Sequence, residues 1–217
     1  MHLGALCARQ NFVIQLAVMG AESTGLQIGG VILAAGGSSR MGQLKQLMLI
    51  AGQPMVRRVA GAVCAAGLGQ VVVVVGAQAE AVTDILTGLP VEIVVNPDWA
   101  KGMSTSLRLG VRTLRPEIQA AFIILADQPA LTEQLMRALV DRYRATRALI
   151  VAPFFQGQRG NPVLFDRALF SELLTVEGDR GARGLVSRHE EKMECVDVHD
   201  PAVIMDVDTR SDYEQMR

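Results

Sequence analysis

The sequence predicts a single three-layer α/β domain, a Rossmann-like sandwich with a mostly parallel central sheet. Short runs of valine and isoleucine alternate with amphipathic segments of helical period, as in a sheet whose strands are buried on both faces. Half of the 217 residues are apolar, 4% are aromatic and 21 are glycine, a composition that suits helices packed closely on such a sheet. A chain of this length buries roughly 70% of its unfolded surface around one core.

The order of the expected elements supports this class. Strands are expected at residues 28–35, 70–75, 91–95, 120–126 and 148–152, and helices at 54–66, 79–86, 104–114 and 132–144. Pro54 and Gly67 supply start and stop signals for the first helix, and Ser104 and Thr132 are the expected N-caps of the last two. Strict alternation of strand and helix indicates parallel strands joined by right-handed crossovers.

The two ends of the chain depart from this alternation. Residues 1–27 fit the pattern poorly, so we expect an N-terminal extension of weak order ahead of a domain at 28–217. The glycine-rich segment 154–162 is expected to form a lid or excursion over the sheet. After it we expect strands at 163–165, 193–198 and 203–207, a helix at 166–174 capped by Asp166, a loop at 178–184 that leads into a short helix, and a final helix from 211.

The first strand ends in a stretch suited to bind phosphate. Gly36, Gly37, Ser38 and Ser39 follow the strand, and Arg40 and Lys45 add positive charge. Glycine lets the backbone N–H groups approach an anion closely, so a di- or triphosphate would fit. The stretch matches neither G-x-x-x-x-G-K-[ST] nor G-x-G-x-x-G, which argues against an ATPase P-loop or a dinucleotide fingerprint.

Two carboxylates stand out because each follows an expected buried strand. Asp127 comes after 120–126 and Asp208 after 203–207, at the carboxyl ends where ligands bind in open α/β sheets. A carboxylate there is costly unless it is paired or bound to metal, and two such oxygens suit Mg²⁺. The alternative is that each caps a helix or turn.

A second polar segment precedes the expected helix at 104–114. The hydroxyls of Ser104 and Ser106, together with Lys101 and Arg108, can face the same phosphate region, because helix N-termini attract anions. An ordinary solvated, capped helix is an equally good interpretation.

Composition excludes several classes of function. With 21 basic and 22 acidic residues the net charge is −1, so we expect no nucleic-acid partner. Cys7, Cys64 and Cys195 lack metal or disulfide spacing, which favours a reducing cytoplasm, and no apolar run nears the roughly 20 residues that cross a membrane. The three histidines form no catalytic pattern; phosphoryl or nucleotidyl transfer can rely on positioning and charge neutralisation instead.

Five segments in order resemble the molybdenum cofactor cytidylyltransferases, in the molybdopterin nucleotidyltransferase group of glycosyltransferase-A-like (nucleotide-diphospho-sugar-transferase-like) folds. They are residues 33–42 with Lys45-Gln46, 102–106, 126–129, 159–165 and 206–209, and the resemblance spans 28–215. It implies transfer of CMP from CTP to the terminal phosphate of molybdenum-bearing molybdopterin, with release of pyrophosphate and with a client molybdoenzyme as a further partner.

The resemblance also implies roles for individual residues. Nucleotide binding falls to Leu33, Ala34, Ala35, Gly36, Gly37, Ser38, Ser39, Arg40, Lys45, Ser104 and Ser106. Arg40, Lys45 and Asp127 would be catalytic, with Mg²⁺ (or Mn²⁺) on Asp127 and Asp208. The acceptor would approach Arg159, Gly160, Asn161 and Pro162.

Three alternatives stay open. A guanylyltransferase of the same group would use GTP, but such proteins often have glycine where this chain has Ala35, and Ala35 with Gln46 favours CTP. A nucleotidyltransferase for a sugar or alcohol phosphate shares the opening loop and the metal, and the segment at 154–165 favours the pterin over it. A cofactor-carrying chaperone for a molybdoenzyme is the third.

Overall fold

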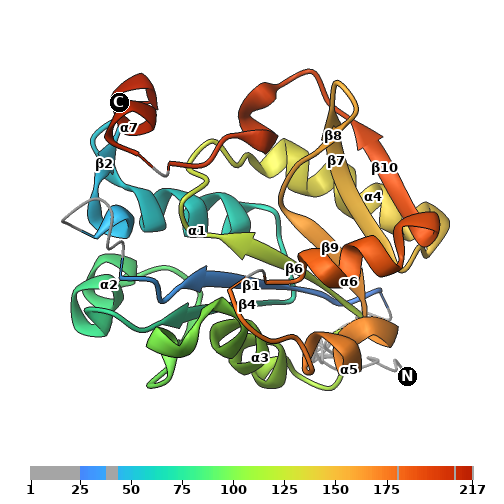
Figure 1. Ribbon diagram of the computed structural model, residues 1–217, viewed down its shortest axis with the longest axis horizontal. Coiled ribbons are helices and arrows are strands. Elements are labelled where there is room, and N and C mark those ends of the chain that lie inside the picture. The colour runs from blue at the N-terminus through green and yellow to red at the C-terminus, as the bar shows by residue number, and fades with distance from the viewer. Residues whose placement is uncertain (1–24, 38–43, 180, 208, 217) are drawn as a thin grey trace, which may run out of the picture.

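The computed structural model describes residues 25–37, 44–179, 181–207 and 209–216. Its main sheet has eight strands in the order β10-β7-β9-β6-β1-β4-β5, with β8 paired to β7, and helices cover both faces (Figure 1). This confirms the predicted three-layer α/β class. The expected extension at 1–27 lies almost entirely outside the described residues and stays a prediction.

Most elements lie where the apolar pattern placed them. The main-sheet strands are β1 (Ile28–Ala34), β4 (Gln70–Val75), β5 (Glu92–Val95), β6 (Ala120–Leu125), β7 (Ile150–Phe155), β8 (Gln158–Arg159), β9 (Val163–Asp166) and β10 (Met193–Asp197). The helices are α1 (Met55–Ala65), α2 (Ala79–Leu86), α3 (Met103–Thr113), α4 (Glu133–Thr146), α5 (Phe170–Leu173), α6 (Arg183–Arg188) and α7 (Arg210–Met216).

Strand β9 breaks the parallel order. It runs antiparallel between β6 and β7, with Val163 opposite Ile123 and Asp166 opposite Ala120. The start of β9 therefore lies near the carboxyl end of β6. This places residues 159–162 at the sheet edge where ligands of α/β proteins bind.

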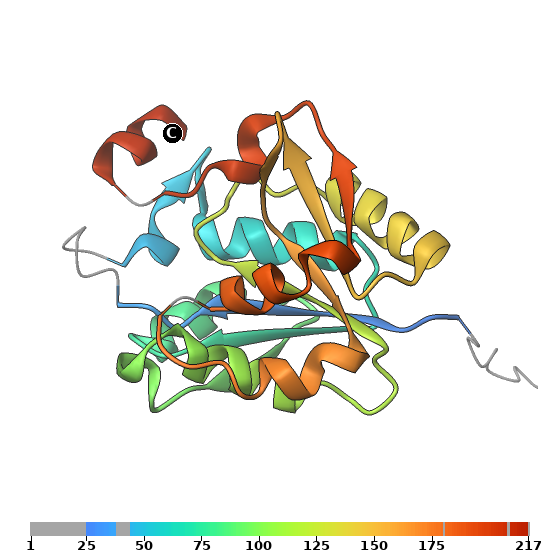
Figure 2. The same cartoon turned by 45° about the vertical axis from the view of Figure 1, so that its right-hand side comes forward.

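Alternate side chains of the strands enter two cores. Val73 and Val75 of β4 face α1, α2 and α4, whereas Val72 and Val74 face α3, α5 and α6 (Figure 2). Helix α3 packs so closely that a Cβ at Gly110 would lie 2.2 Å from the Val31 side chain, so glycine is required there. Burial on both faces explains why these strands read as continuous apolar runs.

Two predictions about local structure are wrong. Residues 203–207 form no strand: the 3-10 turn Pro201–Ile204 takes their first part, because Pro201 begins it and the Asp200 carboxylate accepts a hydrogen bond from the Ala202 N–H at 2.9 Å. The N-cap of α3 is Gly102, with φ 114°, and not Ser104. A distant carboxylate, Asp179, accepts the Met103 N–H at 3.1 Å and makes a serine cap unnecessary.

Other local predictions hold. Thr132 and Asp166 cap their helices, accepting from Leu135 N–H at 3.2 Å and Ala168 N–H at 2.8 Å. The segment 154–162, expected as a lid or excursion over the sheet, instead extends β7 and returns as β8, an antiparallel strand of the same sheet. The sequence pattern missed the hairpin of β2 (Leu49–Ile50) and β3 (Gln53–Pro54), whose turn uses positive φ at Ala51 and Gly52.

Within the described part of the chain no helix is long and apolar enough to span a bilayer.

Candidate functional site

Asp127 follows β6 and forms the centre of the candidate site. Its Oδ2 pairs with Lys45 Nζ at 3.0 Å, and the two side chains are 24% and 15% exposed. Its Oδ1 is buried without a hydrogen-bond partner in the described part of the chain. Because an unsatisfied buried carboxylate oxygen is costly, this atom suits a bound cation.

The second predicted metal ligand, Asp208, lies outside the described residues. The residue before it is placed: the Val207 N–H donates to the Asp127 carbonyl at 3.1 Å. This hydrogen bond holds the backbone beside Asp127 at the residue that directly precedes Asp208. No group of three or more histidine, cysteine or acidic side chains gathers as a metal site among the described residues.

Gln46 joins the two sides of the glycine-rich loop. It is 6% exposed, and its Nε2 donates to the carbonyl of Gly36 at 2.8 Å and to that of Ala34 at 3.4 Å. The predicted site residues Ser38, Ser39 and Arg40 lie outside the described residues. Gln46 therefore fixes where the backbone leaves β1.

Trp99 covers the first part of this loop. A Cβ at Gly76 would lie 2.7 Å from Trp99, and a Cβ at Gly37 would lie 3.0 Å from its ring. Glycine at Gly76 is needed for the indole to pack there, and glycine at Gly37 avoids a tight contact with the ring. The Trp99 side chain thus forms one wall of the loop region.

A polar cluster fixes the start of α3. The Asn96 Nδ2 donates to Thr105 Oγ1 at 2.8 Å and to Ser106 Oγ at 2.9 Å. Ser104 and Ser106 are 2% and 4% exposed. Ser106 thus has a structural hydrogen bond, and nucleotide binding by these two serines stays a prediction.

The N-terminus of α3 already has an anion. Asp179 accepts from the Met103 N–H, and the Gly178 carbonyl accepts from the Ser104 N–H at 3.1 Å. The two cations expected there have other partners as well: Lys101 pairs with Asp98 at 2.7 Å, and Arg108 donates to the Val176 carbonyl at 2.6 Å. In the ligand-free chain these groups at the start of α3 therefore contact one another, and phosphate binding at this helix end stays a prediction.

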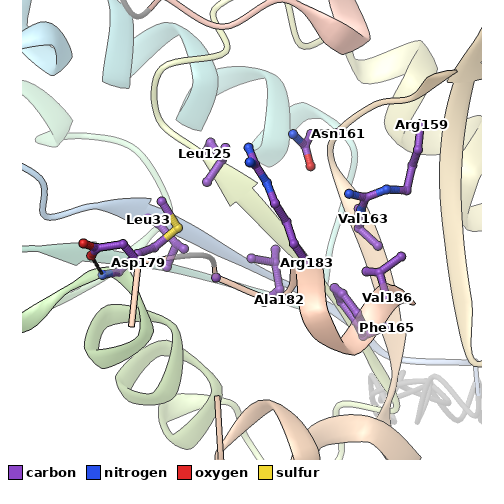
Figure 3. Close-up of a pocket in the computed structure, with 13 residues that line it drawn as sticks. Leu33, Leu125, Arg159, Asn161, Val163, Phe165, Asp179, Ala182, Arg183 and Val186 are labelled. Atoms are coloured by element: carbon purple, nitrogen blue, oxygen red, sulfur yellow. Dashed lines mark hydrogen bonds between the residues drawn. The ribbon is translucent and has the colours of Figure 1, made fainter. Parts of the chain in front are cut away.

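A cavity of about 130 Å³, the arginine cavity, lies between α6 and the ends of β1 and β6 (Figure 3). Its wall is largely apolar, with Leu33, Leu125, Val163 and Phe165 among the lining residues. Asn161, Asp179, Arg159 and Arg183 contribute polar groups, and Asp179 is engaged at the start of α3. In Figure 3 both arginine side chains extend into it from different elements, and Asn161 lies between their ends.

The two arginines of this cavity suit an anion. Burial lowers the pKa of Arg159, the nearby Arg183 lowers it further, and Glu190 opposes them. Neither guanidinium hydrogen-bonds or ion-pairs with a described residue at the distances of a direct contact. Two cations held together at an apolar cavity favour an anionic ligand with an apolar body.

Arg183 was not among the predicted site residues. The glycine-rich loop before α6 was visible in the sequence, but nothing local to it showed that the fold would bring Arg183 beside Arg159.

The backbone of the predicted acceptor segment is firmly held. The Gly160 N–H donates to the Pro153 carbonyl and the Asn161 N–H to the Val203 carbonyl, each at 2.8 Å. A Cβ at Gly160 would lie 2.5 Å from the Val203 carbonyl oxygen, so this position needs glycine. The Asn161–Pro162 peptide is cis. The segment is a fixed wall of the site.

A parallel α/β sheet with a glycine-rich loop, a lysine and a metal-ready aspartate at one edge defines a nucleotidyltransferase. Residues 30–193 match the family of the MobA-like NTP transferase domain, and the chain belongs to that family. Membership in this nucleotidyltransferase group confirms the resemblance seen in the sequence, at the level of the group.

Three relatives illustrate the range of the family. The chain is 32% identical to nicotine blue oxidoreductase of Paenarthrobacter nicotinovorans over 187 residues, 83% of this chain and 91% of the relative. It is 30% identical to the purine catabolism protein PucB of Bacillus subtilis over 201 residues, 87% and 95% of the two chains.

The third relative has solved structures. The crystal structure of Rv0371c from Mycobacterium tuberculosis superposes with a TM-score of 0.81 at 30% identity, covering 89% of this chain and 98% of that one. Its complex with manganese gives 0.76 at 28% identity, covering 88% and 97%. A divalent metal therefore binds to a protein of the same fold.

Proposed function

We propose that the chain transfers CMP from CTP to the terminal phosphate of molybdenum-bearing molybdopterin and releases pyrophosphate, with Mg²⁺ or Mn²⁺ bound. The observation that carries this proposal is Asp127, whose Oδ1 is buried and unpartnered among the described residues while Oδ2 holds Lys45. A carboxylate with one buried, unpartnered oxygen can bind a cation through that oxygen. The manganese complex of Rv0371c supports a divalent ion.

The donor side of the site would be organised around Asp127. Asp127 and Asp208 would hold the divalent ion, which when bound neutralises charge at the α-phosphate. Lys45 compensates Asp127 in the free protein and, with Arg40, would bind the β- and γ-phosphates that leave as pyrophosphate. Gln46 would keep the loop carbonyls aside so that backbone N–H groups face the nucleotide.

The acceptor side needs no general base. The acceptor is a phosphate monoester, which with a second pKa near 6 is mostly deprotonated at neutral pH. One of its oxygens forms the new bond to the α-phosphorus as the bond to the β-phosphate oxygen breaks, so no proton must be removed. Arg159 and Arg183 would hold this anionic nucleophile in the arginine cavity.

The choice of CTP rests on Ala35. Ala35 is 4% exposed and leaves less space at the loop for adaptation than glycine would. Gln46, the other residue that favoured CTP, uses its amide nitrogen on the loop carbonyls. Base preference therefore depends on the loop's shape more than on a contact from Gln46.

The test is a transfer assay with molybdenum cofactor, Mg²⁺ and each nucleoside triphosphate, following pyrophosphate and the dinucleotide product. We expect CTP to be consumed in preference to GTP, EDTA to stop the reaction, and Mg²⁺ or Mn²⁺ to restore it. Asp127→Ala should lose activity by orders of magnitude and still fold, whereas the exposed Asp141→Ala serves as a control. Lack of consumption of either nucleotide, or an unaffected Asp127→Ala, would refute the proposal.

Further experiments test the other functions that the sequence leaves open. Sugar 1-phosphates and alcohol phosphates test other acceptors. Retention of cofactor without pyrophosphate release, with a stable complex to an apo-molybdoenzyme, would indicate a carrier.

The relative named nicotine blue oxidoreductase favours one further candidate, an oxidation–reduction activity. The glycine pattern at Gly36–Gly37 is not a dinucleotide fingerprint, which argues against it. Oxidation of NADH or NADPH with nicotine blue as acceptor, in the absence of any nucleoside triphosphate, would support it.

A further inference from the structure

A separate cavity, the amide cavity, has a volume of about 350 Å³ and lies between the start of α4 and residues 198–203. That size falls in the range of small-molecule sites, roughly 300–1,000 Å³. Most lining residues are aliphatic, including Leu131, Leu135 and Val203, and no lysine or arginine of the described chain lines it. Its chemistry therefore differs from that of the arginine cavity and disfavours a phosphate.

Gln128 is the feature of this cavity that calls for a ligand. It lines the cavity and is only 5% exposed. Its side-chain amide makes no hydrogen bond to any residue in the described part of the chain. The amide atoms are not sealed from solvent, so they open onto the cavity, where a ligand or ordered water can satisfy them.

The backbone around Gln128 is fixed, so the amide is positioned in advance. The Gln128 carbonyl accepts from Leu131 N–H at 3.2 Å, and the Pro129 carbonyl accepts from Arg58 Nε at 2.7 Å. On the other side, the Asp127 carbonyl accepts from Val207 N–H. A ligand that binds here meets a prearranged donor and acceptor and need not order the loop.

Two other polar side chains at the cavity cap turns: Thr132 Oγ1 accepts from Leu135 N–H, and Asp200 Oδ1 accepts from Ala202 N–H. Gln134 and His199 also line the cavity but are exposed, and Asn161 is half-buried. Gln128 is therefore the buried amide that the cavity presents to a ligand. An amide pairs best with a group that presents a donor and an acceptor side by side, as the lactam edge of a heterocycle does.

We propose that the amide cavity binds a neutral heteroaromatic ring and that Gln128 recognises its lactam edge. In naming the ring a pterin, the proposal rests on the proposed function. Asn161 lines both cavities, so they adjoin at this residue. One acceptor could then place its phosphate against Arg159 and Arg183 and its ring against Gln128.

The test uses pterin itself as a fluorescent probe, titrated with the full-length protein in the absence of nucleotide. Gln128→Leu keeps the volume and removes the amide, and Gln128→Glu keeps the size but removes the donor. We expect either change to weaken pterin binding about tenfold or more. Gln119→Leu, exposed at the other end of β6, is the control, and thermal unfolding confirms that each variant folds.

A methylated ligand makes the test specific for the lactam edge. Pterin methylated at N3 lacks the ring N–H, so wild-type protein should bind it about tenfold more weakly than pterin. Gln128→Leu should bind the two alike. Equal binding of pterin by wild type and Gln128→Leu, or equal binding of both ligands by wild type, overturns the inference.

The outcomes separate this inference from the proposed function. If the protein transfers CMP from CTP but binds pterin equally well without the Gln128 amide, only the cavity assignment is refuted. Pterin binding that depends on Gln128, in a protein that consumes no nucleotide, upholds the cavity and refutes the transfer reaction.

Discussion

Two aspartates at opposite ends of the sheet show how differently the molecule treats a carboxylate. Asp166, opposite Ala120 at the amino end of β6, uses both oxygens: Oδ1 accepts from Ala168 N–H at 2.8 Å and Oδ2 from the Tyr143 hydroxyl at 2.5 Å. Asp127, at the carboxyl end, uses Oδ2 with Lys45 and leaves Oδ1 buried without a described partner. The fold satisfies both carboxylate oxygens of Asp166 and leaves Oδ1 of Asp127 available to a ligand.

The partner of Asp166 confirms its structural character. Burial, followed by the hydrogen bond to Asp166, raises the pKa of Tyr143 to about 12. The phenol therefore stays protonated and donates to the carboxylate throughout the physiological range. Nothing about this pair needs a ligand.

Exchanging the two carboxylates for amides should produce opposite results. Asp127→Asn should lower transfer about 10³-fold, the equivalent of about 4 kcal/mol, because a metal ligand loses its charge, while stability changes little. Asp166→Asn should cost about 1–3 kcal/mol of unfolding free energy with an unchanged kcat. Denaturant unfolding and steady-state kinetics on both variants check this, and a stability loss confined to Asp127→Asn would invalidate the contrast.

At the carboxyl end of the sheet, substitution of Arg183 should weaken binding of the acceptor. Arg183→Gln should raise the KM for the acceptor about tenfold, or about 1.4 kcal/mol, and leave the KM for CTP unchanged, because it removes one of two cations from the arginine cavity. Arg188→Gln on the same helix, which pairs with Glu172 at 3.5 Å, is the matched control. An unchanged acceptor KM would exclude Arg183 from the site.

A smaller effect is expected at the loop. Gln46→Leu leaves the carbonyls of Ala34 and Gly36 without their donor, so the KM for CTP should rise roughly fivefold, about 1 kcal/mol. Gln53→Leu, exposed in the hairpin, should change nothing. If Gln46→Leu binds CTP normally, the loop is held by other contacts.

The last effect, of similar size, is expected at the amino end of the sheet and concerns stability alone. Tyr143→Phe should lower the free energy of unfolding by about 1 kcal/mol and leave transfer at neutral pH unchanged. Because the folded pKa lies above the value of 10.0 for a free phenol, the phenol's contribution is complete below pH 10 and is lost as pH rises toward 12. Unfolding at pH values from about 8 to about 11.5 should show a smaller decline for the variant than for wild type.

Prediction from sequence succeeds where the signal is local. The run at Val71–Val75 and the caps Thr132 and Asp166 lie where the sequence pattern predicts them, since apolar period and cap chemistry act over a few residues. The predicted N-cap of α3 fails because its anion, Asp179, lies 76 residues away from Met103.

The site shows the same limit. Local pattern predicts Lys45 and Asp127 as candidate site residues, and the two side chains lie together. It does not identify Arg183, which acquires its neighbour Arg159 only through the fold, or Gln128, which resembles an ordinary loop glutamine until its burial is known. The strand expected at 203–207 is wrong for a local reason, and the Asp200-Pro201 pair is its available signal.

The packing of Trp99 against Gly37 and Gly76 gives the protein an internal optical reporter. Trp99 is the chain's single tryptophan, and at 36% exposure its ring borders both solvent and the loop. Its emission therefore senses one place in the molecule, without any label. If a nucleotide binds at the loop as we propose, it would change the polarity around that ring, so donor binding could be followed in native protein by the wavelength and intensity of the Trp99 emission alone.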